Sequence, residues 1–190
     1  PDPAAAPPEV APARFRAVRD AIRARLWGLA RAQLADGLAL GPPTADDRPG
    51  IEALVAASGL PVEVVGDAFP AAYVVARRGD AIVGVAALEA HGDAALLRTV
   101  AVAAGERGRG TGLALVADRL AQAWAARLTA VYLLTTTAAP LFRRFGFVDA
   151  ARDAVPAALA ATRELAGLCP SAATCLRLDV GAAAAAAIGA

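Results

Sequence analysis

A short glycine-rich run contains the residues best suited to bind a charged ligand. Residues 105–112 read Gly-Glu-Arg-Gly-Arg-Gly-Thr-Gly and lie between an apolar segment and an amphipathic one. Glycines allow positive φ angles and a close approach of the backbone to a ligand. Free N–H groups at the start of the following helix, together with the helix dipole, favour a diphosphate. Arg107 and Arg109 add positive charge for phosphate oxygens.

Two other phosphate-binding motifs do not fit this run. A P-loop requires Gly-Lys followed by Ser or Thr, and the chain contains no Lys. A dinucleotide fingerprint, Gly-x-Gly-x-x-Gly, begins at Gly108, but position 113 is Leu. That fingerprint also needs an acidic residue about 20 positions later, where the apolar segment 131–135 ends in threonines. By itself the run is therefore either a coenzyme site or an ordinary glycine-rich turn between a strand and a helix.

Composition excludes several classes of protein. A chain of 190 residues is long enough for one domain with an appendage and a sizeable core. The net charge of +1 does not favour nucleic acid as a partner. Two Cys and one His exclude a dense disulfide scaffold and an ordinary Cys/His zinc site. The same counts lead us to expect no metal. No apolar run reaches the roughly 20 residues of a membrane span, and no signal peptide is evident, so we expect a cytoplasmic protein.

Alternating strands and helices are expected to position the glycine-rich run. The strands 72–77 and 81–89 flank the tight turn Arg78-Gly79-Asp80 and should form an antiparallel hairpin. A strand over 96–102 leads into the run, and a helix from about Thr111 to Arg127 follows it. The other expected elements are strands at 38–40, 131–135 and 175–180 and helices at 46–58, 138–145 and 156–165.

This order of elements predicts an α/β fold with a mixed, mostly antiparallel sheet flanked by helices. We expect the domain to cover residues 36–180, after a disordered Pro/Ala-rich lead at 1–12 and before an Ala-rich tail at 181–190. Residues 13–35 have the pattern of a basic amphipathic helix. Such a helix could lie on a membrane or a partner, but packing on its own domain or on a twin subunit is favoured, so a homodimer is one expectation.

The strand before the run, the run itself and the helix after it together resemble the acetyl-CoA motif of the GNAT superfamily of N-acetyltransferases. That motif reads Arg/Gln-x-x-Gly-x-Gly/Ala, which is met here by Arg107, Gly110 and Gly112. Residues 141–147 read Leu-Phe-Arg-Arg-Phe-Gly-Phe and are similar to the family's Leu-Tyr-x-x-x-Gly-Phe. The resemblance extends in order and spacing over about residues 38–180. It implies the GNAT fold, with acetyl-CoA as co-substrate and no metal.

Three shorter stretches, at 133–138, 154–158 and 168–172, resemble the arsenic-resistance (arsinothricin-type) N-acetyltransferases, which are small bacterial members of the family. This narrower resemblance implies acetyl transfer to the primary amine of a small amino acid or of its arsenical or phosphinic analogue. Two alternatives stay open. One is another amine acceptor, such as a different amino acid, an antibiotic or a polyamine. The other is a module that senses acetyl-CoA or arsenic without turnover.

The family resemblance also implies roles for individual residues. Backbone N–H groups around Val100 to Val102 would hold the oxyanion and the pantetheine. The family's Tyr, which protonates the leaving thiolate in many relatives, is Phe142 here, and a phenyl ring cannot donate a proton. No general acid is therefore assigned. The predicted coenzyme contacts are Val100, Ala101, Val102, Arg107, Gly108, Arg109, Gly110, Thr111, Gly112 and Phe142.

The acceptor side depends on charged residues in the strands before the run. Glu89, which ends the strand 81–89, is the candidate base for the amine proton, with a solvated acid near the turn at His91 as the alternative. Arg98 is a permanent charge within an apolar strand, so it must meet an anion, either a substrate carboxylate or Glu89. Together with Arg98, Tyr73 and Thr136 complete the predicted substrate contacts.

The remaining reactive residues are given smaller roles. His91 is expected to be a turn residue with no part in catalysis. Cys169 and Cys175 could form an arsenic-binding thiol pair, but packing as small apolar residues near the last strand is favoured. Arg143 and Arg144 are expected to face solvent.

Overall fold

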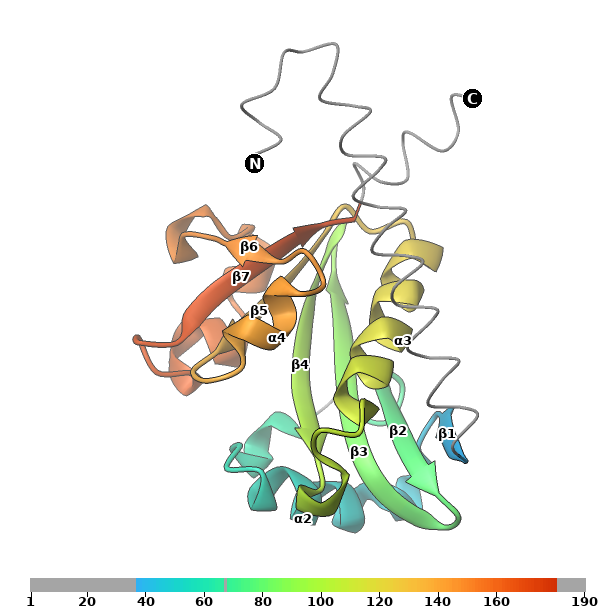
Figure 1. Cartoon of the computed structure of the whole chain (residues 1–190). Coiled ribbons are helices and arrows are strands. Elements are labelled where there is room, and N and C mark those ends of the chain that lie inside the picture. Colours follow the sequence, from blue (N-terminus) through green and yellow to red (C-terminus); the bar gives the residue numbers. More distant parts are fainter. Residues whose placement is uncertain (1–36, 67, 181–190) are drawn as a thin grey trace, which may run out of the picture.

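The computed structural model describes residues 37–66 and 68–180. The predicted lead at 1–12, basic helix at 13–35 and tail at 181–190 lie outside these described residues. A seven-stranded sheet in the order β1-β2-β3-β4-β5-β7-β6 forms the centre of the described part (Figure 1). Its strands are β1 (Leu38–Gly41), β2 (Tyr73–Arg78), β3 (Ala81–His91), β4 (Ala94–Val102), β5 (Ala130–Thr135), β6 (Val148–Asp149) and β7 (Thr174–Asp179).

The sheet is mixed and mostly antiparallel, which confirms the predicted fold class. Only the central pair β4–β5 is parallel, and the other neighbouring strands run antiparallel. Parallel pairing of β4 with β5 requires a crossover, and the helix that follows the glycine-rich run supplies it. The α-helices are α2 (Arg48–Ala57), α3 (Thr111–Ala125), α4 (Ala139–Arg143) and α5 (Ala157–Ala160).

The two halves of the sheet separate between β4 and β5. These strands pair only where Ala94–Leu96 lie beside Ala130–Tyr132, and beyond this point they diverge, as Figure 1 shows. A β-bulge lies in the diverging part of β4, because Thr99 and Val100 together lie opposite a single residue of β3. Thr99 has a φ of 56°, which is unusual for a β-branched residue. Bulges bend the strand that carries them, so β4 turns away from β5 just before the glycine-rich run.

Two helices cover opposite faces of the β2–β4 half. Side chains alternate between the two faces of a strand, and on β3 Leu88 packs in the core under α3 whereas Ala87 packs in the core under α2. The core under α3 includes Val116 and Leu120. The core under α2 includes Ile51, Val55, Val85 and Ala101. No helix of the described residues is long and apolar enough to cross a membrane.

The prediction of one helix over 156–165 is wrong. The chain forms the short α5, a break, and then a single π-helical turn η6 (Glu164–Leu168). At the break, the Thr162 hydroxyl donates to the carbonyl of Leu159 at 2.7 Å. Within η6, Gly167 has a φ of 153°, which is outside the helical region. A side-chain hydroxyl that bonds the nearby backbone competes with regular helix, so this connection between β6 and β7 is irregular.

We expect Leu176→Ala to destabilise the fold strongly. Leu176 on β7 is 0% exposed within the core under α3. Truncating such a leucine costs about 2–5 kcal/mol because apolar contacts are lost and a cavity remains. The free energy of unfolding from urea titration measures this cost. Val148→Ala is the control: Val148 on the neighbouring β6 is 61% exposed, and its loss should change stability by about 0.5 kcal/mol or less. Equal losses in both variants would contradict the assignment of the core.

Candidate active site

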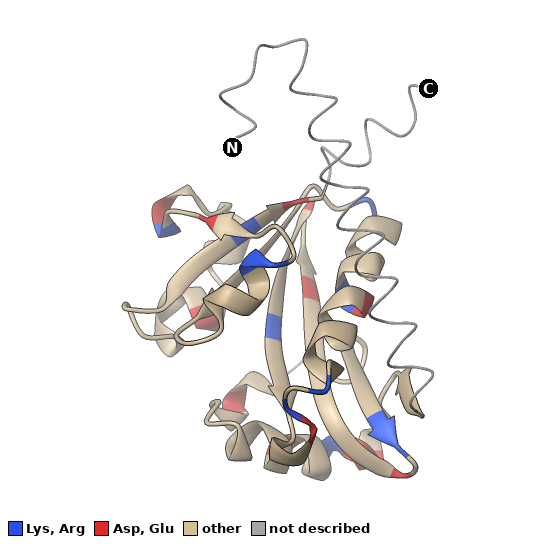
Figure 2. Cartoon of the chain, viewed as in Figure 1, with Lys and Arg blue, Asp and Glu red and all other residues tan. Residues whose placement is uncertain are grey.

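The glycine-rich run forms the loop between β4 and α3, as predicted. After one 3-10 turn, η4 (Ala104–Glu106), the chain reaches Gly108 and Gly110, which adopt φ values of 77° and 89°. Gly110 is the N-cap of α3. The first N–H groups of a helix have no partner within the helix, so they are available to an anion at this end of α3. Figure 2 shows basic segments in the same loop.

The predicted coenzyme residues other than Phe142 lie on one continuous stretch of backbone. Val100 to Val102 lie in the part of β4 that has diverged from β5, and the loop follows directly. The Arg109 side chain is 54% exposed. Arg107 Nε donates to the carbonyl of Val102 at 3.3 Å, so this side chain lies along the end of β4. Phe142 is buried in a core cluster that also contains Leu97 of β4 and Leu133 of β5. The phenyl ring therefore packs near the point where the two strands separate.

Thr111 differs from the expectation in the direction of its side chain. The residue is fully buried, and its hydroxyl donates to Glu106 Oε2 at 3.3 Å. Only the backbone N–H of Thr111, at the first position of α3, is left for a ligand in the loop. Its hydroxyl instead holds the two ends of the loop together.

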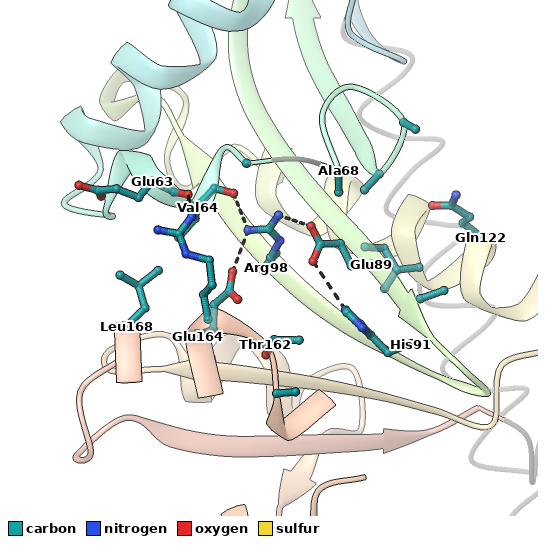
Figure 3. Close-up of a pocket in the computed structure, with 17 residues that line it drawn as sticks. Glu63, Val64, Ala68, Glu89, His91, Arg98, Gln122, Thr162, Glu164 and Leu168 are labelled. Carbon is teal, nitrogen blue, oxygen red and sulfur yellow. Dashed lines mark hydrogen bonds and ion pairs between the residues drawn. The ribbon is translucent and has the colours of Figure 1, made fainter. Parts of the chain in front are cut away.

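A cavity of about 550 Å³ lies beside the same strand. Its walls are formed by residues 63–66 and 68–72, by the adjoining parts of β3 and β4, by Gln122 of α3 and by the connection 161–168. Figure 3 shows Arg98, Glu89, Glu164 and His91 pointing toward one another, whereas Glu63 points away from them. Its charged and titratable lining residues are Glu63, Glu89, His91, Arg98, Arg163 and Glu164.

Arg98 is the centre of this cluster. Its Nη1 donates to Glu164 Oε1 at 2.7 Å and to the carbonyl of Val64, and its Nη2 donates to Glu89 Oε1 (Figure 3). The guanidinium also lies over the ring of Tyr73, 5.9 Å from its centroid. Burial works against the charged form, but the electrostatic effects of Tyr73, Glu164 and Glu89 outweigh it, so the pKa of Arg98 is raised. The anion expected for Arg98 was a substrate carboxylate or Glu89. The structure shows Glu89 and adds Glu164, which was not predicted.

Glu89 also faces an imidazole. Its Oε2 lies 3.7 Å from His91 Nε2, which is too long for a hydrogen bond. This Nε2 is buried and has no hydrogen-bond partner among the described residues. β3 ends at His91, as the predicted turn requires, but the side chain lines the cavity rather than only forming the turn. A carboxylate and an imidazole at one wall can accept a proton from a bound amine.

The structure does not bring Tyr73 or Thr136 to the cavity. Tyr73 is 2% exposed, and its hydroxyl donates to the carbonyl of Val64 at 2.8 Å, so it supports the wall from behind. Burial, more than any other cause, raises the pKa of Tyr73. Thr136 is exposed beyond the end of β5. Among the three predicted substrate contacts, only Arg98 lines the cavity with Glu89.

Sequence reasoning missed Glu164, which is 66 residues from Arg98 along the chain. The available signal was indirect: an arginine inside an apolar strand requires anions, but no spacing rule identifies a partner in an irregular segment. Glu63, Arg163 and Gln122 of the lining were also missed. Each belongs to a different element, so only the packing of these elements brings them to one cavity.

Both cysteines are free thiols near the last strand. Cys175 is buried in the core beside Tyr132 and Leu159, and Cys169 is partly buried. Burial raises the pKa of each thiol, which disfavours the reactive thiolate. This agrees with the packing interpretation. The described residues contain no group of three or more His, Cys, Asp or Glu side chains that could hold a metal ion.

Comparisons with known proteins show what the chain is similar to. Residues 70–149 match the family model of the acetyltransferase (GNAT) domain. Solved structures with the same fold include N-acetylglutamate synthase from Neisseria gonorrhoeae with coenzyme A and L-arginine, with a TM-score of 0.63 and 19% identity over 75% of this chain and 33% of that chain. Rv2747 from Mycobacterium tuberculosis, solved with CoA, has a TM-score of 0.62 and 23% identity over 74% of this chain and 98% of that chain. The ribosomal-protein-S18-alanine N-acetyltransferase from Escherichia coli has a TM-score of 0.59 and 14% identity over 75% of this chain and 94% of that chain.

These findings confirm the GNAT fold, and the match to the acetyltransferase (GNAT) domain model covers residues 70–149. A search of the curated proteins finds no match. The chain spans about a third of the length of the Neisseria synthase. The narrower resemblance to the arsenic-resistance enzymes remains a prediction.

We expect Arg98→Met to destabilise the fold by about 3–5 kcal/mol, because it leaves two carboxylates in one largely buried site without their cation. The Arg98 side chain is only 10% exposed and pairs with Glu89 and Glu164. Urea unfolding at neutral pH measures the loss. Arg143→Met is the matched control, since the Arg143 side chain is 48% exposed in its pair with Asp149, and such pairs contribute about 1 kcal/mol or less. Comparable losses in both variants would show that the Arg98 cluster is not a buried network.

Proposed function

We propose that this chain, which carries a GNAT acetyltransferase domain at residues 70–149, transfers the acetyl group of acetyl-CoA to the primary amine of a small amino-acid-like molecule. We assign the complete domain to residues 36–180. One observation carries the proposal. A cavity lined by carboxylates and a guanidinium lies beside the strand whose diverging end leads into the anion-binding loop.

The coenzyme is assigned to the diverging part of β4 and the loop after it. The N–H groups at the start of α3, with Arg107 and Arg109, would bind the diphosphate. The pantetheine would then run along Val100 to Val102, where β5 no longer pairs with β4. Two neighbours with this fold, the Neisseria synthase and Rv2747, were solved with CoA, which supports acetyl-CoA as the co-substrate.

The reaction needs no metal. The neutral amine attacks the thioester carbonyl, a C–N bond forms, and the C–S bond breaks to release CoA. Glu89 is the proposed acceptor of the amine proton, and backbone N–H groups of β4 stabilise the oxyanion. At the position of the family's Tyr the chain has the buried Phe142, which has no proton to give. Solvent therefore protonates the departing thiolate, whose intrinsic pKa is not far above neutral.

The acceptor class follows from the charges of the cavity. Glu89 and Glu164 suit an ammonium group, and Arg98 and Arg163 suit a carboxylate, so a zwitterion complements this wall. A volume of about 550 Å³ is of the size used by small-molecule sites. The narrower resemblance extends the class to arsenical or phosphinic amino-acid analogues. Because Glu164 already holds Arg98, a substrate carboxylate would share or replace that contact.

A second candidate function is a module that binds acetyl-CoA without turnover. The observation that favours it is Phe142 in place of a proton-donating phenol. Acetyl transfer to another amine, such as an antibiotic or a polyamine, keeps the same coenzyme site and changes only the acceptor.

We expect the chain to release thiol from acetyl-CoA in the presence of amino acids or a phosphinic amino-acid analogue, and much less with polyamines. Thiol detection against such a panel measures this. Glu89→Gln should lower kcat by about 100-fold, the lower range for loss of a general base, with the KM for acetyl-CoA unchanged. Glu52→Gln on α2 is the control with the same chemical change. Saturable CoA binding without thiol release on any amine would instead support the sensing module.

We expect Arg98→Lys to remove the preference for a carboxylate on the substrate. Lysine keeps the charge in the buried cluster but cannot repeat the fork geometry of arginine. The measurement compares the KM of an accepted amino acid with that of its carboxamide. The wild-type protein should prefer the acid, and the variant should raise the KM of the acid by at least about 10-fold, the effect of about 1.4 kcal/mol of lost binding, with little change for the amide. An equal change for both would overturn the role of Arg98 in binding the carboxylate.

A further inference from the structure

An acidic side chain is buried at the base of the loop that is proposed to bind a diphosphate. Glu106 ends η4, immediately before Arg107, and is only 8% exposed. A carboxylate at this place would repel phosphate unless its charge were compensated. The chain nevertheless buries it, so its contacts must offset both burial and repulsion.

We infer that Glu106 is a positioning residue that holds the coenzyme loop in its binding conformation, and that Arg78 neutralises its charge so that the loop still attracts an anion. This inference rests on the proposed binding of acetyl-CoA. The acetyl-CoA motif of the sequence begins at Arg107, one residue later, and does not include either side chain.

The contacts of Glu106 connect the loop to the sheet and to α3. Arg78, at the end of β2, donates through Nε to Oε1 at 2.9 Å and to Oε2 at 3.0 Å. Thr111, the first residue of α3, donates its hydroxyl to Oε2 at 3.3 Å. Since Glu106 and Thr111 flank residues 107–110, this bond closes the loop on itself. The Arg78 contact then fixes the closed loop to the β2–β3 hairpin.

Packing restricts the same end of α3. The Thr111 side chain is fully buried against Gly84 of β3. A Cβ atom at Gly84 would lie 2.8 Å from Leu115 Cδ1 and 3.1 Å from Thr111 Cγ2. The start of the helix therefore lies directly on the sheet, and the free N–H groups of its first turn cannot shift without breaking the contacts of Thr111.

The electrostatics agree with this role. The hydrogen bond from Arg78 is the main cause that holds the pKa of Glu106 below its usual value, so the carboxylate stays ionised at neutral pH. Arg109 Nη1 lies 3.8 Å from Glu106 Oε1, and its largely exposed side chain can still reach a ligand. Arg78, Arg107 and Arg109 together exceed the single negative charge of Glu106, so this part of the protein stays net positive for the diphosphate.

Titration calorimetry with CoA on the full chain tests the inference. The proteins compared are the wild type, Glu106→Gln, Arg78→Gln and the double variant, each at a temperature where circular dichroism shows it folded. Glu52→Gln is the control, because Glu52 also pairs with an arginine, Arg48 at 2.9 Å, but on α2. Steady-state kinetics on the same proteins separates the KM for acetyl-CoA from kcat and from the KM for the amine.

We expect each single variant to weaken CoA binding about 10-fold, the effect of one lost charge-assisted contact. In the kinetics, the KM for acetyl-CoA should rise, while kcat and the KM for the amine stay unchanged. Because the two residues act as one unit, the double variant should bind no more weakly than either single variant. The inference is overturned if the Glu106→Gln variant binds CoA within about twofold of the wild type, which is the result expected for the control Glu52→Gln. Additive losses of about 100-fold in the double variant would overturn it too. A wild-type chain that does not bind CoA would overturn the proposed function as well.

Discussion

The limited pairing of β4 with β5 opens the sheet where both the loop and the cavity lie. The two strands are parallel neighbours over three residue pairs and then separate. Two residues of β4 lie opposite one of β3 at Thr99, and this bulge bends β4 away from β5. A sheet that was paired to its end would leave neither a backbone edge for a ligand nor a route between its two halves. The loop and the cavity both adjoin the separated part of β4.

The cavity shows how a buried charge organises elements that are distant in sequence. Arg98 cannot lie in the sheet without anions, and it receives one from β3, Glu89, and one from the irregular connection to β7, Glu164. The carbonyl of Val64 adds a third acceptor from the segment after α2. One side chain thus joins three walls of the cavity, and the same cluster gives the cavity its mixed charge. Stability and substrate selection would therefore change together in variants of Arg98.

The loop before α3 combines flexibility of the backbone with rigid anchors. Gly108 and Gly110 permit its path, whereas Glu106, Thr111 and Arg78 fix its ends. Glycine alone would leave the loop many conformations in the absence of ligand, and ordering it would then cost binding energy. Anchors at both ends reduce that cost, because the N–H groups of α3 are already directed at one place.

The sequence by itself determined the mixed sheet, the order of its strands along the chain and the loop with its glycines and arginines. These features depend on local periodicity and on residues close together in sequence, and the resemblance of the motifs implied the GNAT fold. One exception was also local in origin: the helix expected over 156–165 is broken near Thr162, whose hydroxyl bonds the carbonyl of Leu159. Which charged side chains form pairs depends on the tertiary packing. Glu164 and Arg98 are 66 residues apart, and Arg78 and Glu106 are 28 apart. Tyr73 does not line the cavity, because its hydroxyl bonds the carbonyl of Val64. A side chain's partner depends on how elements pack and on the bend of β4, and no spacing within the chain encodes that geometry.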